Sequence, residues 1–237
     1  MSFCDGTYCA HMPAVQDHKR AFEGDVGPNT GGMGTYSFAD HSLPFLSKED
    51  IVAAQKTNER VAAELYKKTG EKFRGILYGG FMLTGDGVKV IEYNARFGDP
   101  EAMNVLSLLE TDFMDICNAI VTGSLADLKI VFANKATVCK YVVPVGYPNN
   151  PSKNFEVVCN TSLDGLYLAA VQERGGVITA TGSRTAAFVG VDPNIVVAER
   201  LAEKGVTGIG GNLFHRKDIG TKDLISRRKK HMKKVLG

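Results

Sequence analysis

The chain has 237 residues, of which 44% are hydrophobic and 23% charged, so it can bury a real core in one large domain or two small ones. Lysine and arginine number 28 against 26 aspartate and glutamate, and this net charge of +2 gives no reason to expect a nucleic-acid or membrane partner for the whole molecule. The five cysteines lack C-x-x-C spacing and no apolar run approaches the roughly 20 residues that cross a bilayer, which argues against a disulfide framework, a zinc site and a membrane span and favours a cytoplasmic protein.

The chain opens on a hairpin signal. Asp5-Gly6 is typical of a tight hairpin turn, but only Met1 to Cys4 precede it to pair with the segment from Thr7 to Val15. We therefore expect that a segment upstream belongs to the same fold.

A glycine-rich stretch follows, with five glycines between Gly24 and Gly34. This density predicts a shaped loop that is neither helix nor regular strand. A helix comes next, with Ser47 as its N-cap and Gly70 as its terminator.

Two strands and two helices are expected in the middle of the chain. The strands run from Gly75 to Leu83 and from Val88 to Ala95 around a glycine turn, which predicts an antiparallel hairpin. Asp99 is the expected N-cap of a short helix, and Thr111 the N-cap of a second one that ends before Gly123.

The pattern changes near residue 136 to short strands at 138–143, 155–159 and 177–180. One helix follows, with Asp192 as N-cap, Pro193 at its first position and Gly205 at its end. We expect an α+β fold with a larger lobe over 1–130, an antiparallel sheet with helices, and a smaller α+β domain over 131–237.

The first candidate site is a pair of oxygen-bearing side chains, Glu92 and Asn94, on the second strand of the central hairpin. Alternation places both on one face, opposite Ile91, Tyr93 and Ala95. A carboxylate beside an amide oxygen suits magnesium, which takes its remaining ligands from water and substrate phosphates. The alternative is an ordinary exposed strand face.

The residues after this pair favour the site. Arg96 follows at once, and Gly98-Asp99-Pro100-Glu101 leads into a helix N-terminus, so a cation, donors and a helix dipole are expected at one point. Asp99 can equally be a plain N-cap, and Glu101 can serve only to complement the dipole.

The second candidate is Gln16-Asp17-His18-Lys19-Arg20, which leads into Gly27-Pro28-Asn29-Thr30-Gly31-Gly32-Met33-Gly34. Backbone amides of a glycine loop can hold phosphate, and Lys19 and Arg20 add positive charge. The loop matches neither the Walker nor the G-x-G-x-x-G pattern, and His18 can be either structural or catalytic.

The third feature is the basic run from Arg227 to Lys234, which can be a nucleic-acid stripe or a solvated helix face. Leu224, Met232 and Val235 recur at helical spacing and no aromatic residue is interleaved. The helix face is favoured, and we expect no nucleic-acid partner.

These motifs resemble those of the phosphoribosylamine-glycine ligase family of purine biosynthesis, a branch of the ATP-grasp ligases. The resemblance covers essentially the whole chain and rests on five segments in the family's order: QDHKR, GPNTGGMG, YGGFM, IEYNARFGDPE and HRKDIG. It implies that ATP phosphorylates glycine and that the amine of 5-phosphoribosylamine then attacks the glycyl phosphate.

The resemblance also implies roles for individual residues. Glu92 and Asn94 would bind Mg2+ or Mn2+, and Arg96, Asp99 and Asp17 would be catalytic. The substrate-binding set would be Lys19, Arg20, Asn29, Thr30, Gly31, Gly32 and Gly34.

The family's N-terminal domain and small ATP-grasp lobe have no counterpart in this sequence, which therefore resembles the C-terminal portion. We expect the isolated chain to be incomplete. A separate N-terminal half of the enzyme is one partner that it could pair with. Two alternatives stay open, another ATP-grasp ligase acting on a different carboxylate and amine, and a non-catalytic assembly module.

Overall fold

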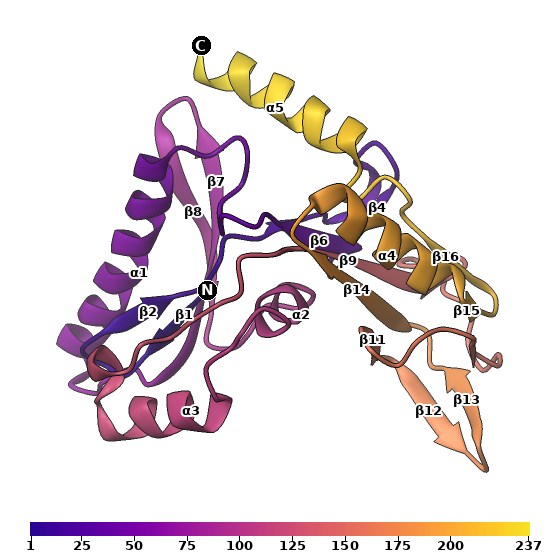
Figure 1. The fold of residues 1–237 in the computed structure, drawn as a ribbon, viewed down its shortest axis with the longest axis horizontal. Coiled ribbons are helices and arrows are strands. Elements are labelled where there is room, and N and C mark those ends of the chain that lie inside the picture. The colour runs from indigo at the N-terminus through magenta and orange to yellow at the C-terminus, as the bar shows by residue number, and fades with distance from the viewer.

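The computed structural model describes residues 1–237 and has the α+β architecture that the sequence predicts, with antiparallel sheets throughout. Figure 1 shows two groups of elements, one around β1, β2, β7 and β8 and the other around β9, β14 and α4, with α2 lying between them. None of the helices combines the length and apolar composition that crossing a membrane requires.

The first sheet has four strands in the order β2-β1-β7-β8. Its members are β1 (Ser2–Cys4), β2 (Cys9–His11), β7 (Gly75–Thr84) and β8 (Gly87–Asn94). Both predicted hairpins are confirmed, since β1 pairs with β2 and β7 pairs with β8. The short strand β1 is paired on both sides, because β7 also lies beside it.

Two helices cover this sheet. Helix α1 (Lys48–Thr69) has the predicted N-cap, Ser47, in a capping box with Asp50, and it ends at Gly70 in the left-handed region. Helix α3 (Phe113–Thr122) is capped by Asp112 rather than by the expected Thr111, because the Asp112 carboxylate accepts from the amide of Met114.

The second sheet has six strands in the order β11-β14-β9-β6-β3, with β16 pairing to β9. It contains β3 (Gln16–Asp17), β6 (Gly34–Ser37), β9 (Ala136–Pro144), β11 (Leu166–Leu168), β14 (Ala186–Asp192) and β16 (Leu213–His215). Strands from both sides of residue 130 therefore share one sheet, and the proposed division at that residue stays a prediction.

The centre of the second sheet is β9, whose residues are all buried. Helix α4 packs against β9 and β14, while the short helix α2 (Glu101–Leu106) packs against β6 and β9. This packing fixes the start of α2 between the two sheets.

The prediction for the glycine-rich stretch is wrong in part. Residues Val26–Asn29 form strand β5, which pairs with β4 (Arg20–Phe22), and Gly34 is the first residue of β6. The glycines permit the turns of this ribbon rather than excluding a strand: Gly27 has φ +84° and Asp25 also takes a positive φ.

Helix α4 (Ile195–Thr207) differs from its predicted bounds at both ends. Asn194 is the N-cap in place of Asp192, because its side chain accepts from the amide of Val196. Gly205 lies inside the helix instead of ending it. A Cβ there would lie 2.1 Å from a ring carbon of Phe188, so the glycine allows this ring to pack against the helix.

The remaining elements are short, apart from the basic C-terminal helix. They are η1 (Leu125–Asp127), the ribbons β10 (Val158–Cys159) with β15 (Ile209–Gly210) and β12 (Val171–Arg174) with β13 (Val177–Ala180), and α5 (Lys222–Leu236). The predicted strand at 155–159 shortens to β10, because Phe155 and Val157 bond to the backbone of β13.

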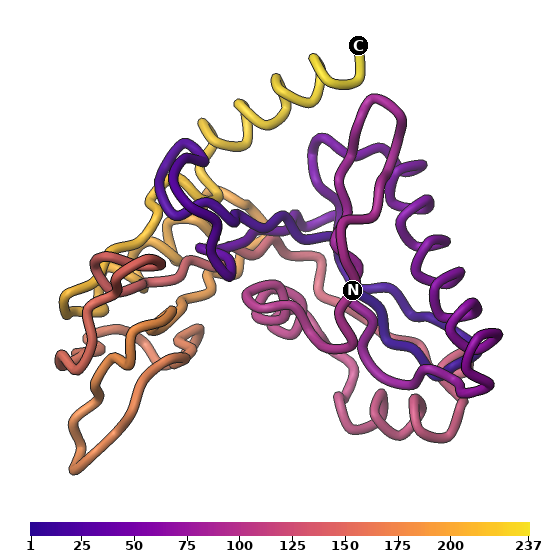
Figure 2. Tube along the Cα trace, turned by 180° about the vertical axis from the view of Figure 1, so that it is seen from behind, coloured from indigo at the N-terminus to yellow at the C-terminus, as the bar shows by residue number.

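Helix α5 confirms the predicted helical spacing, with Leu224 and Ile225 buried. Its C-terminal end reaches the tip of the β7–β8 hairpin, as the views in Figures 1 and 2 both show. A Cβ on Gly85 would lie 3.2 Å from the carbonyl oxygen of Val235. The two groups of elements therefore touch at this tip as well as at α2.

Candidate functional site

The face of β8 that carries Glu92 and Asn94 is defined by its neighbours. The Tyr93 hydroxyl donates to Asn58 on α1 at 2.9 Å, so Tyr93 points toward that helix. Glu92 and Asn94 lie on the opposite face, as alternation predicts. Asn94 is paired in register with Tyr78 of β7, and directly opposed residues share a face.

The same face meets the start of α2. The Tyr78 hydroxyl donates to Oε1 of Glu101 at 2.6 Å, and Glu101 is only 4% exposed. Burial and the neighbouring Glu101 charge raise the pKa of Tyr78, so the tyrosine stays a donor. Glu101 was not among the predicted site residues, and the sequence signal for it was its position in the run after Asn94.

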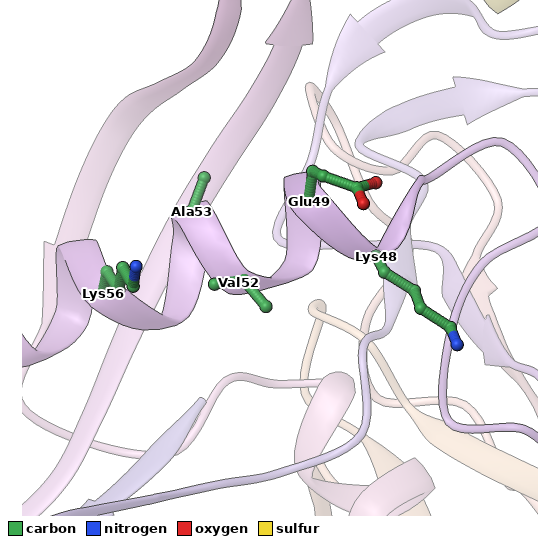
Figure 3. A pocket seen from close by; sticks show the side chains of 5 residues that line it. All are labelled: Lys48, Glu49, Val52, Ala53 and Lys56. Atoms are coloured by element: carbon green, nitrogen blue, oxygen red, sulfur yellow. The ribbon is translucent and has the colours of Figure 1, made fainter.

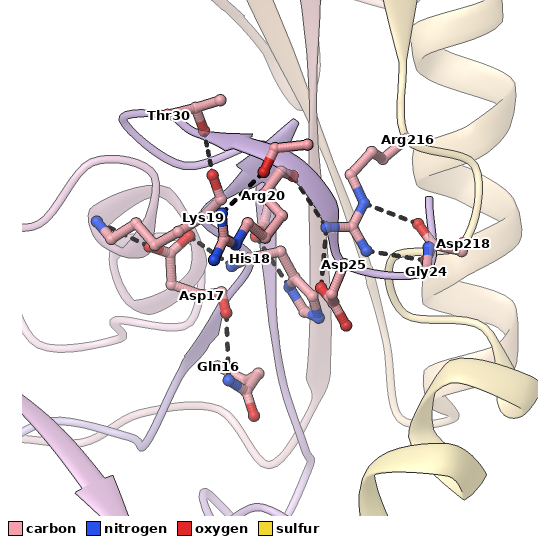
Figure 4. Close-up of polar contacts among 12 residues, drawn as sticks. Gln16, Asp17, His18, Lys19, Arg20, Gly24, Asp25, Thr30, Arg216 and Asp218 are labelled. Atoms are coloured by element: carbon pink, nitrogen blue, oxygen red, sulfur yellow. Dashed lines mark hydrogen bonds and ion pairs between the residues drawn. The ribbon is translucent and has the colours of Figure 1, made fainter. Parts of the chain in front are cut away.

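Asp17 and Lys19 form an ion pair at the end of β3. The Lys19 Nζ lies 3.0 Å from Oδ2 of Asp17, and the other Asp17 oxygen accepts from the His18 amide at 2.7 Å (Figure 4). Burial, with the Glu101 charge adding to it, raises the pKa of Asp17 to about 6 against the opposing effect of Lys19. This carboxylate therefore titrates near neutral pH.

The charge state of Lys19 depends on carboxylates from three elements, β3, α2 and β8. Its partial burial disfavours the charged form, but the carboxylates of Asp17, Glu101 and Glu92 outweigh this and raise its pKa. Asp17 is the carboxylate that contacts the Lys19 ammonium, while Glu101 and Glu92 act on it through their charges.

Asp99 is not the N-cap of α2, contrary to one of its two predicted interpretations. The helix begins after Pro100 without a side-chain cap. The Asp99 carboxylate instead accepts from the Tyr141 hydroxyl and from Nη2 of Arg184, each at 2.8 Å. Asp99 keeps 52% of its side chain exposed, so it remains open to a ligand.

Arg184 is the most connected residue that the sequence reasoning missed. Its Nη1 donates to the Asp99 carbonyl at 2.9 Å and to the Gly31 carbonyl at 3.1 Å, and its guanidinium lies 4.7 Å from the centre of the Tyr141 ring. Both Tyr141 and Arg184 come from the region after residue 130. No motif singles them out, and only the fold brings them to the site.

The glycine loop is held in place by hydrogen bonds within the segment from Lys19 to Gly32. Thr30 donates from its amide and hydroxyl to the Lys19 carbonyl at 2.7 and 2.9 Å, and the Gly32 amide donates to the Thr30 hydroxyl at 3.0 Å. A Cβ on Gly32 would lie 2.7 Å from Pro100 and 2.8 Å from Asp17. The loop thus allows close approach of these segments, and a phosphate-binding role for Gly31, Gly32 and Gly34 stays a prediction.

His18 lies in the QDHKR segment and Arg216 in the HRKDIG segment, and Arg216 bonds to the backbone of the first segment at Arg20. Nδ1 of His18 donates to the Gly34 carbonyl at 3.2 Å, and burial together with Arg216 and Arg228 lowers its pKa to about 4. Arg216 is 1% exposed and donates to Asp218 at 2.9 and 2.8 Å, as well as to the backbone of Arg20 (Figure 4). The burial of His18 and its bond to the Gly34 carbonyl favour a structural role for this histidine.

The side chains of Glu92 and Asn94 make no hydrogen bond or ion pair, and three further predicted residues make theirs away from Asp17 and Lys19. Arg20 donates to the Gly27 carbonyl at 2.8 Å, its register partner Asn29 lies on the same ribbon, and Arg96 donates to the Phe97 carbonyl at 2.7 Å. No hydrogen bond or ion pair joins them to Asp17, Glu92 or Asn94. Arg20 and Arg96 are exposed and can reach a ligand from the rim.

The donor set fits a divalent cation that is shared with a phosphate. No group of three or more His, Cys, Asp or Glu side chains is arranged to hold a metal ion. One carboxylate and one amide oxygen are the small protein contribution that magnesium accepts when phosphates and water complete its shell. Glu92 and Asn94 are therefore compatible with a magnesium nucleotide rather than with an all-protein cage.

A surface hollow elsewhere plays no part in this arrangement. Figure 3 shows it along the first turns of α1, lined by Lys48, Glu49, Val52, Ala53 and Lys56. None of these residues belongs to the predicted site.

Two family models match the chain. Residues 1–102 match the phosphoribosylglycinamide synthetase ATP-grasp (A) domain, and residues 137–222 match the C domain of the same synthetase. A phosphoribosylamine-glycine ligase from Methanosarcina barkeri is 52% identical over all of this chain and 55% of its own length. The chain spans about half the length of the curated relatives it matches.

Solved structures agree on the fold. The phosphoribosylamine-glycine ligase of Thermotoga maritima superimposes with a TM-score of 0.76 at 28% identity, over 92% of this chain and 54% of that one. The urea amidolyase of K. lactis has a TM-score of 0.63 at 12% identity, over 98% of this chain and 13% of that one. The second likeness concerns the fold alone.

Proposed function

Since the chain belongs to the phosphoribosylamine-glycine ligase family and spans about half the length of its curated relatives, we propose that it takes part in the ATP-dependent ligation of glycine to 5-phosphoribosylamine. The products would be glycinamide ribonucleotide, ADP and phosphate. The observation that carries this proposal is that the Asp17–Lys19 ion pair lies close to the start of α2, where Glu101 accepts from Tyr78, the register partner of Asn94.

Glu92 and Asn94 would hold Mg2+ or Mn2+ against the phosphates of ATP. When bound, the cation would neutralise charge on the phosphoryl group that moves to the glycine carboxylate. Arg96 is exposed beside this pair and would stabilise the oxygens of the glycyl phosphate.

Asp17 and Lys19 would position the reacting amine. Lys19 carries a raised pKa and stays charged, whereas Asp17 with a pKa of about 6 is ionised at pH 7 and above. An ionised carboxylate at this place would accept a hydrogen bond from the amine of 5-phosphoribosylamine and orient it toward the acyl phosphate.

Asp99 and Arg184 would bind the glycine end of the site. The half-exposed Asp99 carboxylate is held rigidly by Tyr141 and Arg184, so its position is fixed before substrate arrives. A carboxylate is a suitable partner for the ammonium group of glycine.

The proposal is best tested in a chimera in which this chain replaces the matching part of the Methanosarcina barkeri ligase, which is 52% identical over all of it. The chimera is expected to form ADP only when glycine and 5-phosphoribosylamine are both present. Its matched control carries Glu92→Gln. A folded chimera that forms ADP with another carboxylate or amine would point to a different ligase, and one with no turnover would favour the non-catalytic module.

A further inference from the structure

Cys4 and Cys9 face each other across the first hairpin. They are register partners in the β1–β2 pair, and their Sγ atoms lie 3.1 Å apart. No other two of the five cysteines have sulfur atoms within hydrogen-bonding distance of each other. The pair is therefore singled out by geometry, although its spacing in the sequence is not C-x-x-C.

The hairpin register places Cys4 and Cys9 at a position that is favourable for a disulfide. The Asp5 amide donates to the Tyr8 carbonyl at 3.2 Å and the Met12 amide to the Met1 carbonyl at 3.0 Å, so these are hydrogen-bonded pairs. Cys4 and Cys9 then form a non-hydrogen-bonded pair, where Cα atoms are about 4.5 Å apart and side chains are closest. That separation lies within the range that a disulfide spans.

The two cysteines differ in solvent exposure and in the pKa of their thiols. Cys4 is 0% exposed and Cys9 is 8% exposed, and both pack against Leu77 in a small apolar cluster. The hydrogen bond between the two thiols lowers the pKa of Cys9, whereas the same bond and burial raise the pKa of Cys4. Cys9 is thus the more accessible of the two residues, and its thiol is the one whose pKa is lowered.

We propose that Cys4 and Cys9 form an oxidation site that takes a small peroxide and closes to an intramolecular disulfide. The Cys9 thiolate attacks one oxygen of hydrogen peroxide and the O–O bond breaks, which leaves Cys9 as a sulfenic acid; the other oxygen leaves as hydroxide and becomes water with the proton that the Cys9 thiol gave up. The Cys4 sulfur then attacks Cys9, the S–O bond breaks, and a second water leaves. The two thiols together lose two electrons and two hydrogens, and hydrogen peroxide is reduced to two waters.

The bond would tie an edge strand into the first sheet. Strand β2 is the outermost strand, and β1 connects it to β7, the partner of the strand that carries Glu92. A disulfide between β1 and β2 closes only a short loop, so its effect on the unfolded chain is modest. We expect the midpoint of thermal unfolding to rise by a few degrees.

The test is mass spectrometry of the full chain after limited treatment with hydrogen peroxide and alkylation in denaturant. The expected product has lost two hydrogen atoms and alkylates at Cys117, Cys139 and Cys159 only, while the untreated chain alkylates at all five cysteines. The N-terminal tryptic peptide that contains both Cys4 and Cys9 should carry the bond, and a reducing agent should restore five alkylated thiols.

Two variants control the assignment. Cys9→Ser should abolish the loss of two hydrogens, and Cys117→Ser should retain it. Circular dichroism checks that both variants fold, and peptide mapping of the parent chain does not depend on either. Mixed oxidation of Cys117 and Cys159 without a Cys4–Cys9 bond, or a bond between two chains, would overturn the proposal.

Discussion

Arg184 and Asp99, 85 positions apart in the chain, are joined by two hydrogen bonds. Nη2 of Arg184 donates to the Asp99 carboxylate at 2.8 Å, and its Nη1 donates to the Asp99 carbonyl at 2.9 Å. The guanidinium also lies over the Tyr141 ring. A planar fork with several fixed donors holds a carboxylate in one orientation, which a lysine cannot do.

Arg184→Lys therefore tests whether Asp99 must be held rigidly. In the chimera we expect the KM for glycine to rise about tenfold or more, with a smaller effect on kcat, because ground-state binding is lost. The free energy of unfolding should change by about 1 kcal/mol or less. The matched control is Arg174→Lys on the exposed strand β12. An unchanged KM for glycine would contradict the role of Arg184.

Glu92→Gln tests the metal pair. The swap is nearly isosteric on an exposed strand face, so the fold and the unfolding midpoint of the isolated chain should be retained. In the chimera, magnesium-dependent ADP formation should fall by about a hundredfold or more, because the only carboxylate of the pair is gone. Glu173→Gln is the control on another exposed strand. Turnover close to that of the parent would show that Glu92 is not a ligand.

Gly32→Ala tests the close approach of the glycine loop to Asp17 and Pro100. Gly32 has φ +119° and no room for a Cβ, whereas Gly87 has φ +89° with nothing within 4 Å. Both substitutions carry backbone strain of about 1 kcal/mol, but only Gly32→Ala adds a clash. Urea unfolding of the isolated chain should show Gly32→Ala less stable than Gly87→Ala by about 1–3 kcal/mol. Equal losses would mean that the loop relaxes.

Local sequence signals predicted the elements whose causes are local. Ser47 as the N-cap of α1, Gly70 at its end and the glycine turn of the β7–β8 hairpin all appear as expected. The failures have tertiary causes. Gly205 has the appearance of a helix stop but lies inside α4, because the Phe188 ring occupies the space of its side chain.

In the candidate site, too, residues placed by local sequence signals were predicted and residues placed by tertiary packing were not. Alternation along β8 was sufficient to place Glu92 and Asn94 on one face. Tyr141 and Arg184 could not be predicted from the sequence, because the six-stranded sheet is what brings β9 and the segment before β14 to Asp99. The buried Glu101 was visible as a residue of the run but not as the acceptor of the Tyr78 hydroxyl, which depends on how α2 packs.

Asp17 gives a pH-dependent prediction for the isolated chain. Its pKa is about 6 in the folded state, against about 4 for an unperturbed aspartate in the unfolded chain. Between these values the folded state binds the extra proton, so stability falls as the pH rises from about 4 to about 6. Above this window the ionised Asp17 costs up to about 3 kcal/mol, since each pKa unit corresponds to about 1.4 kcal/mol.

Asp17→Asn removes this charge while keeping an oxygen that can accept from the His18 amide. Near pH 4 the variant and the parent should have similar free energies of unfolding, because the parent is then protonated at Asp17 in the folded state. Above about pH 7 the variant should be the more stable by as much as about 3 kcal/mol. Urea unfolding across this range measures the difference, with Asp86→Asn in the exposed hairpin turn as a control for the loss of one charge. A difference that stays constant with pH would contradict the raised pKa of Asp17 in the folded state.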